Sequence, residues 1–234
     1  MSKLLRSVLA LLAFGIFILS ISVTEAKSQN VLGEILRRID EHNKALQSLR
    51  ADVMMVKHDS ALKITDPPVI GQIQYLAKSK VAKNKRWIRI DWTNPDEHMS
   101  LIGNEYIVYR PKLPQVIKGS SQNGKGTPKI NNALGFINMS KAELKANYSV
   151  IYLGEEKIKD GTATWHLQLS PIKPTDYKLT DLWIDKDGMP LQVKTTWLNN
   201  DWTTVLLSNI KKNKSVSLES FKIHYPKAIK PIPA

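Results

Sequence analysis

Alternation of apolar and polar residues dominates the chain from residue 49 onward. After Leu49, the apolar residues Ala51, Val53 and Met55 occupy every second position. This is the period of a strand that buries one face. Similar stretches predict further strands near residues 73–77, 88–92, 106–109, 149–153, 164–169, 179–185, 191–198, 202–210 and 220–225. The pattern favours a mainly β (α+β) domain.

Short turn sequences separate several of these predicted strands. Lys-Asp-Gly occurs at 159–161 and again at 186–188, and Asn-Asn-Asp occurs at 199–201. Such residues favour the tight turns of β-hairpins. We therefore expect an antiparallel meander rather than a parallel sheet.

Two helices are expected beside the strands. Apolar residues recur at helical spacing over residues 30–46, with charged residues on the other face. Ser140 followed by Glu143 forms a capping box, which predicts a short helix over 141–146. A loop rich in Gly, Ser, Asn and Lys is expected over 118–129, followed by a short apolar segment over 132–139.

The first 26 residues are typical of a secretory signal peptide. Lys3 and Arg6 precede an uncharged apolar run over 8–23, and small residues precede a cleavage site after Ala26. An uncleaved anchor is the alternative, but the run is short for a membrane span. We expect cleavage near Ala26, a single domain over 27–234 and a periplasmic location.

The charge and the cysteine content of the chain limit the classes of partner and modification that we expect. The chain has no cysteine, which excludes both a disulfide framework and a lipid-modified N-terminal cysteine. Its net charge of +13 suits anionic membrane surfaces or acidic partner proteins, or serves only solubility. Export and the scattered lysines argue against nucleic acid as a partner.

Motifs for catalysis or metal binding are missing from the sequence. The five histidines have no metal-ligand spacing, and there is no nucleophile elbow, P-loop or dinucleotide fingerprint. His166 is expected in solvent. Asp96 and Glu97 follow Pro95 between two predicted strands, so we expect a hairpin turn rather than a catalytic pair. The sequence predicts a non-enzyme without a metal or cofactor.

A curved sheet with an apolar concave face must have that face covered or filled. A ligand cavity and a solid core both satisfy this need, and the period of the strands does not distinguish them.

The segment "TNPDEHMSLIGNEYIVYRP" resembles the bacterial outer-membrane lipoprotein carrier family, LolA. Its Pro-Asp-Glu turn, apolar strand and later glycine, tyrosine and proline match in register at six positions: Pro95, Asp96, Glu97, Gly103, Tyr109 and Pro111. Four more segments are similar in the correct order: "ILRRIDEHNKALQSLRADV", "LQLSPIK", "DLWIDKDGMPLQ" and "FKIHYPKAI". The resemblance covers nearly the whole chain after the signal peptide.

The resemblance implies an unclosed antiparallel barrel with an N-terminal helix and short helices as a lid over an apolar cavity. It also implies a carrier that takes lipoproteins from an inner-membrane ABC transporter and hands them to an outer-membrane receptor. Lipoprotein acyl chains would be the cargo, no cofactor would be needed, and a monomer is expected.

Some positions depart from the family. Asn84 stands where the family has an arginine that helps to latch the lid, and Arg86 could replace it only through a shift of strand register. Ile88, Ile90 and Ile107 stand where the family has aromatic residues. These departures keep the apolar wall and leave no arginine at the usual latch position.

Strand parity gives the expected site residues. The predicted cavity wall is Val53, Met55, Ile73, Tyr75, Ile88, Ile90, Trp92, Ile107 and Tyr109. The predicted lid is Leu134, Phe136 and Ile137. The alternatives are a glycolipid-binding or envelope-stress sensing module on the same scaffold, a hydrolase that uses Asp91 or Asp96, and a structural protein with a solid core.

Overall fold

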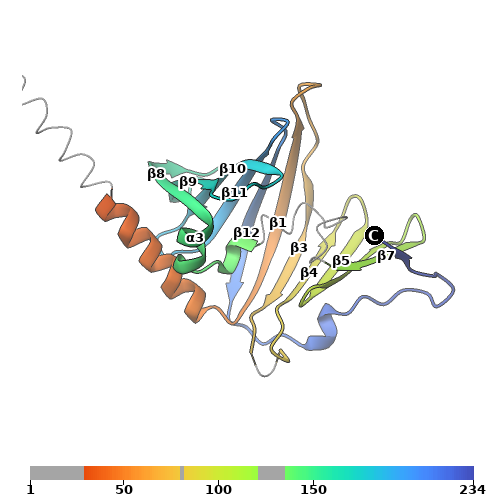
Figure 1. The fold of residues 1–234 in the computed structure, drawn as a ribbon. Helices are drawn as coiled ribbons and strands as arrows, with labels where there is room; N and C mark the ends of the chain where they lie inside the picture. The colour runs from red at the N-terminus through yellow and green to blue at the C-terminus, as the bar shows by residue number, and fades with distance from the viewer. Residues whose placement is uncertain (1–28, 80–81, 121–134) are drawn as a thin grey trace, which may run out of the picture.

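One large antiparallel sheet makes up most of the protein (Figure 1). The computed structural model describes residues 29–79, 82–120 and 135–234, so the predicted signal peptide (1–26) lies outside the described residues. A helix over residues 29–45 precedes the sheet, as predicted. The strands are β1 (Ser48–Asp59), β2 (Ile64–Thr65), β3 (Val69–Leu76), β4 (Trp87–Trp92), β5 (Glu97–Ile102), β6 (Glu105–Arg110), β7 (Gln115–Ser120), β8 (Tyr148–Lys157), β9 (Ala163–Pro171), β10 (Tyr177–Ile184), β11 (Pro190–Trp197), β12 (Trp202–Lys212) and β13 (Ile232–Pro233).

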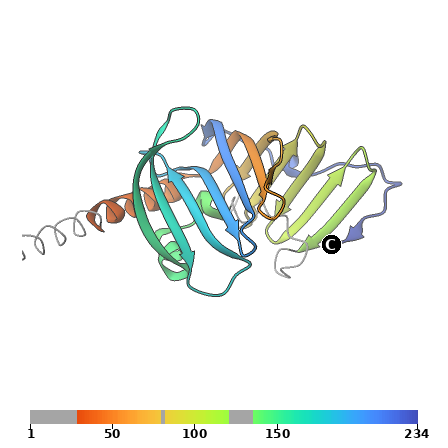
Figure 2. The same ribbon diagram turned by 90° about the horizontal axis from the view of Figure 1, so that it is seen from above.

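The sheet is unclosed. Its strand order is β13-β7-β6-β5-β4-β3-β1-β12-β11-β10-β9-β8, with β2 paired to the end of β1. Neighbours are antiparallel except β13 and β7, and no pairing joins β8 to the opposite end within the described ranges. Figure 2 shows that the β8–β12 half curls strongly, whereas β4–β7 extend from it as a flatter arm. The expected curved antiparallel sheet that does not close into a barrel is confirmed.

Irregular pairing accompanies the curl. The register shifts between Arg50 and Asp52 where β1 pairs with β12, and between Tyr152 and Gly154 where β8 pairs with β9. An extra residue in one strand increases the local twist and bends the strand. The long strands can therefore bend around a concave face.

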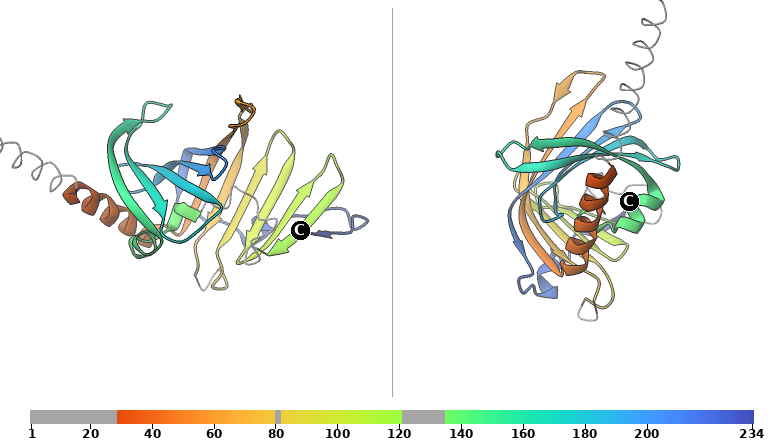
Figure 3. Two further views of the ribbon diagram at one scale, coloured as in Figure 1. Left: turned by 45° about the horizontal axis from the view of Figure 1, so that its top comes forward. Right: turned by 90° about the vertical axis from the view of Figure 1, so that its left-hand side faces the viewer.

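The helix over 29–45 lies on the concave side of the curled half (Figure 3). Its apolar residues Ile35, Leu36 and Ile39 are buried in the same core cluster as the sheet. The Arg38 guanidinium donates a 2.6 Å hydrogen bond to the Lys186 carbonyl in the β10–β11 turn. Within the described residues, no helix has both the length and the apolar character needed to cross a bilayer.

In the described residues between β7 and β8, the chain forms two short helices. The 3-10 helix η2 (Phe136–Asn138) is followed by α3 (Lys141–Asn147). The predicted capping box is present, because Glu143 N donates to Ser140 Oγ and Ser140 N donates to Glu143 Oε2. Residues 118–120 of the expected loop belong to β7 instead, and the rest of that loop lies outside the described residues.

The strand predicted over 220–225 is wrong. The chain forms the 3-10 helix η3 (Leu218–Phe221) and then runs without regular structure to β13. Phe221 is buried against Trp87, with ring centroids 5.8 Å apart. The alternating apolar residues of this segment pack on the outer face of the sheet, and the segment does not form a strand. Periodicity alone does not distinguish a strand from an extended segment that packs on a sheet.

Candidate functional site

Seven residues of the predicted cavity wall share the concave face. Val53, Met55, Ile73, Tyr75, Ile88, Ile90 and Trp92 are all 8% exposed or less and belong to one core cluster. Strand register explains the grouping, because Ala51, Ile73, Ile90 and Met99 lie opposite one another across β1, β3, β4 and β5. Residues directly opposite in an antiparallel sheet point to the same face.

The structure places Ile107 and Tyr109 on the outer face instead. On β6, Tyr106 and Val108 are the buried residues, and they lie opposite Leu101 and Met99 of the concave face. Tyr109 contacts the ring of Tyr225, at 6.1 Å between centroids. Residues 106–109 of β6 are all apolar or aromatic, so the sequence does not indicate which alternate residues face the core. The C-terminal segment covers the outer face of this strand.

Two of the three predicted lid residues lie over this face. Phe136 and Ile137 of η2 are 3% and 2% exposed and belong to the concave-face cluster. The Phe136 ring lies 5.7 Å from that of Tyr148, and the Asn43 side chain of the first helix donates to the Met139 carbonyl. Leu134 lies outside the described residues.

An apolar pocket of about 380 Å³ opens at one end of the concave face. This volume lies within the range of about 300–1,000 Å³ found for small-molecule sites. Its lining is Met55, Lys57, Val69, Trp92, Pro95, Asp96, Glu97, Arg110, Lys112 and Leu113. Predicted wall residues Met55 and Trp92 therefore border open space, while the other five predicted wall residues on this face lie in the closed part of the core.

A row of threonines crosses the apolar face of the curled half. Thr180, Thr195 and Thr203 lie opposite one another on β10, β11 and β12, and all three are buried. The Oγ1 atoms of Thr180 and Thr195 have no hydrogen-bond partner in the described structure. Sequence reasoning missed this row, because β-branched threonine fits a strand without signalling which face it occupies.

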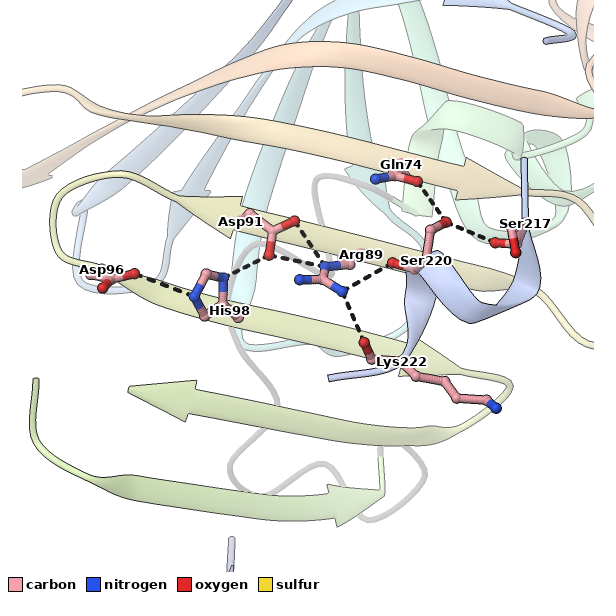
Figure 4. A network of polar contacts seen from close by, with 8 residues as sticks. All are labelled: Gln74, Arg89, Asp91, Asp96, His98, Ser217, Ser220 and Lys222. Atoms are coloured by element: carbon pink, nitrogen blue, oxygen red, sulfur yellow. Dashed lines mark hydrogen bonds and ion pairs between the residues drawn. The ribbon is translucent and has the colours of Figure 1, made fainter. Parts of the chain in front are cut away.

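Histidine, carboxylate and arginine side chains form a network on the outer face (Figure 4). His98 Nδ1 lies 2.7 Å from Asp91 Oδ1, and His98 Nε2 lies 3.3 Å from Asp96 Oδ1. Arg89 pairs with Asp91 and donates to the carbonyls of Ser220 and Lys222. The network joins the β4–β5 hairpin to the C-terminal segment.

The same network bears on the hydrolase alternative. The acceptors within reach of the Ser220 hydroxyl are Gln74 Oε1, at 3.0 Å, and the Ser217 carbonyl, at 2.7 Å, and His98 instead contacts Asp91 and Asp96. A hydroxyl nucleophile needs a base within hydrogen-bond reach. Asp91 pairs with Arg89 and His98, and Asp96 pairs with His98, so among the described residues both carboxylates act as partners that hold the hairpin in place.

A second histidine cluster corrects the expectation that His166 lies in solvent. Its side chain is 17% exposed and lies between Glu156, at 3.0 Å, and Asp181, at 3.1 Å. The ring also stacks on Trp183, with centroids 4.4 Å apart. Among the described residues, no group of three His, Cys, Asp or Glu side chains is arranged to hold a metal ion.

Burial changes the titration of two further groups near the concave face. Burial, with a contribution from the charge of Lys212, lowers the pKa of His42 to about 4. Burial and a 2.6 Å hydrogen bond to the Tyr148 hydroxyl raise the pKa of Tyr177 far above its ordinary value. Both groups are therefore neutral at pH 7, as suits an apolar surround.

No family model matches the sequence, and no curated protein matches it either. Among solved structures, an uncharacterized conserved protein from Thermus thermophilus is 13% identical, and the match covers 87% of this chain and 99% of that chain with a TM-score of 0.53. MucB is 12% identical, and the match covers 82% of this chain and 62% of the MucB chain with a TM-score of 0.52. The chain shares its fold with these two proteins.

A LolA superfamily protein from Nitrosomonas europaea also matches, at 14% identity and a TM-score of 0.41, over 82% of this chain and 97% of that chain. At such identities a likeness concerns the fold, and function has to be argued from the site itself.

Proposed function

We propose that the protein is a periplasmic carrier that shields the acyl chains of lipoproteins or lipids on its concave face. The observation that supports this most is the apolar wall of the unclosed sheet, which ends in an open pocket floored by Met55 and Trp92. The proposed route is from an inner-membrane ABC transporter to an outer-membrane receptor, with the carrier as a monomer.

The physical need for such a carrier is large. Each methylene of an acyl chain costs about 0.8 kcal/mol to expose to water. A molecule with two or three chains therefore does not leave a membrane at a useful rate without an apolar container. Because binding requires no bond to be made or broken, the function needs no catalytic residue and no cofactor.

The buried state of the face implies how cargo enters. Five predicted wall residues are covered, and η2 and the first helix lie on the concave side. In the proposed cycle, the acyl chain enters at the pocket and displaces Phe136 and Ile137. The unsatisfied hydroxyls of Thr180 and Thr195 would then bond the ester carbonyls of the cargo, since an unmet buried hydroxyl costs about 1–3 kcal/mol.

Fluorescence titration with cis-parinaric acid tests the proposal. Met55→Gln and Ile90→Gln place polar groups on the concave face and should each weaken binding at least about fivefold, which corresponds to about 1 kcal/mol of binding free energy. Ile107→Gln is the matched control on the outer face and should bind like the unsubstituted protein. Equal binding by all three variants, each with an unchanged circular dichroism spectrum, would remove the concave face as the site.

A binding module on the same scaffold is the alternative, either for a glycolipid or as an envelope-stress sensor. The edge strand β8 favours a protein partner, because Ile151 and Leu153 are half exposed along it. Exposed edge strands pair readily with another chain. Loss of a partner protein on Ile151→Lys substitution, with lipid binding unchanged, would favour the sensor.

A further inference from the structure

The pocket at the end of the concave face combines an apolar floor with a charged rim. Met55, Val69 and Trp92 come from β1, β3 and β4 and form the floor. Leu113, which is 67% exposed, comes from the β6–β7 turn and lies at the rim. Pro95, three cationic side chains and two carboxylates complete the lining; the charged residues are Lys57, Arg110, Lys112, Asp96 and Glu97.

The charges of the rim are not balanced within the protein. Arg110 Nε donates a 2.6 Å hydrogen bond to Glu97, and Asp96 lies 3.3 Å from His98. The ammonium groups of Lys57 and Lys112 have no ion-pair partner within the described part of the chain. Lys57 and Lys112 thus stand beside an apolar floor without a direct ion pair, in a rim that carries one more cation than carboxylates.

The exposed apolar residues show that this end of the sheet is the open one. Leu62, Leu113, Ile172 and Leu198 lie in the connections between β1 and β3, β6 and β7, β9 and β10, and β11 and β12, and Ile64 lies in the two-residue strand β2 within the first of these connections. Strand direction brings these connections to the same end as the pocket. The remaining large exposed apolar residues of the described chain lie within strands. An amphiphile would therefore meet the protein at this end.

We propose that the pocket binds an anionic amphiphile, with the acyl chain on Met55 and Trp92 and the headgroup between Lys57 and Lys112. The proposal rests on the proposed function and adds the class of ligand. A carboxylate or phosphate headgroup neutralises the two lysines, whereas a neutral headgroup leaves them unpaired. The apolar floor distinguishes this site from one for a free anion.

A pair of probes that differ only in charge tests this. cis-Parinaric acid carries a carboxylate, and its methyl ester has the same chain without the charge. The unsubstituted protein should bind the acid about three to ten times more tightly than the ester, as expected for two partly exposed ion pairs. Lys57→Gln/Lys112→Gln should abolish this preference, so that acid and ester bind equally. Lys159→Gln, in the β8–β9 turn at the opposite end, is the matched control and should keep it.

The outcomes separate the two proposals. Equal binding of acid and ester by the unsubstituted protein, or an unchanged preference in the double variant, overturns the headgroup assignment while the carrier function stands. Failure of both probes to bind overturns the carrier function itself. Phosphatidic acid should displace the bound acid, and displacement by inorganic phosphate alone would reassign the lysines to a free anion and overturn the proposal.

Discussion

At Gly188 the β10–β11 turn meets the backbone of the first helix. The residue has a φ of +85°, and a Cβ placed there would lie 2.3 Å from the Arg38 carbonyl oxygen. Only glycine combines this conformation with this approach.

Gly188→Ala should therefore lower the free energy of unfolding by about 2 kcal/mol or more, since strain and a backbone clash add. Urea denaturation measures the change. Gly161→Ala, in the β8–β9 turn, is the control: its φ is also +85° but no atom lies near its Cβ, so its loss should be smaller. Equal losses would show that conformation alone matters at both turns.

Thr180 and Thr195 carry buried hydroxyls without partners in the described structure. Valine has almost the same shape and no polar atom, so Thr195→Val should stabilise the unliganded protein by about 1 kcal/mol and raise its Tm. Differential scanning calorimetry tests this. A lower Tm would mean that the hydroxyl already has a partner in solution.

At the scale of elements, the first helix contains a titrating group in a position that resists protonation. His42 is 8% exposed, and its pKa of about 4 lies below the ordinary value of 6.5. Between these two values the unfolded chain binds a proton that the folded chain does not bind. The contribution of neutral His42 to the free energy of unfolding is therefore fully present above pH 6.5. It is lost as the pH falls towards 4.

The predicted slope from His42 is at most about 1.4 kcal/mol per pH unit within that window. His42→Gln should flatten the dependence in urea denaturation. Equal slopes in the unsubstituted protein and this variant would show that His42 binds a proton equally well in the folded and unfolded chains.

The C-terminal segment is a second element held from a distance. Arg89 on β4 donates to the Ser220 and Lys222 carbonyls, at 3.0 and 2.9 Å (Figure 4). Hydrogen bonds from a charged donor are worth about 1.5–3 kcal/mol.

Arg89→Ala should release this segment and increase amide hydrogen exchange over residues 213–231. Arg37→Ala removes an arginine whose ion pairs with Glu34 and Glu41 lie on the exposed face of the helix, so it should leave that exchange unchanged. Unchanged exchange in Arg89→Ala would assign the anchoring to Phe221 and its apolar neighbours.

Sequence reasoning succeeded where one residue pattern had one physical meaning. The capping box at Ser140 predicted where a helix begins, and the alternation on β1, β3 and β4 predicted strands and their buried face. It failed on β6 and at 220–225, where apolar residues lie on the outer face or cover it. Both failures have the same cause. The C-terminal segment packs against the outer face of the sheet and makes part of that face apolar, and local sequence periodicity does not predict such a contact.

The charged lining of the pocket could not be predicted from the sequence, because Lys57 is distant along the chain from the other charged residues. Lys57, Arg110 and Lys112 come from separate strands and turns, and only the register of the sheet brings them together. Whether Arg86 replaces the latch arginine that is absent at position 84 stays a prediction. Asn84 and Arg86 border a pocket that Glu143 of α3 also lines, so both positions lie beside the helix that follows η2.

In the molecule as a whole, the proposed carrier function depends on an apolar face that accepts an acyl chain. The face is continuous from β1 to β10, since Met55, Val205, Val193 and Leu182 lie opposite one another across four strands. This face could be buried under helices that a lipid displaces, or it could be part of a permanently packed core. Both arrangements give the same packing in the unliganded protein. They differ in whether lipid binds.

Native mass spectrometry of the protein purified from a bacterial periplasm tests this most directly. We predict an adduct with the mass of an acyl lipid or lipoprotein, removed by delipidation and regained on addition of phosphatidic acid. A single unliganded species that stays unliganded with excess lipid would contradict the carrier account.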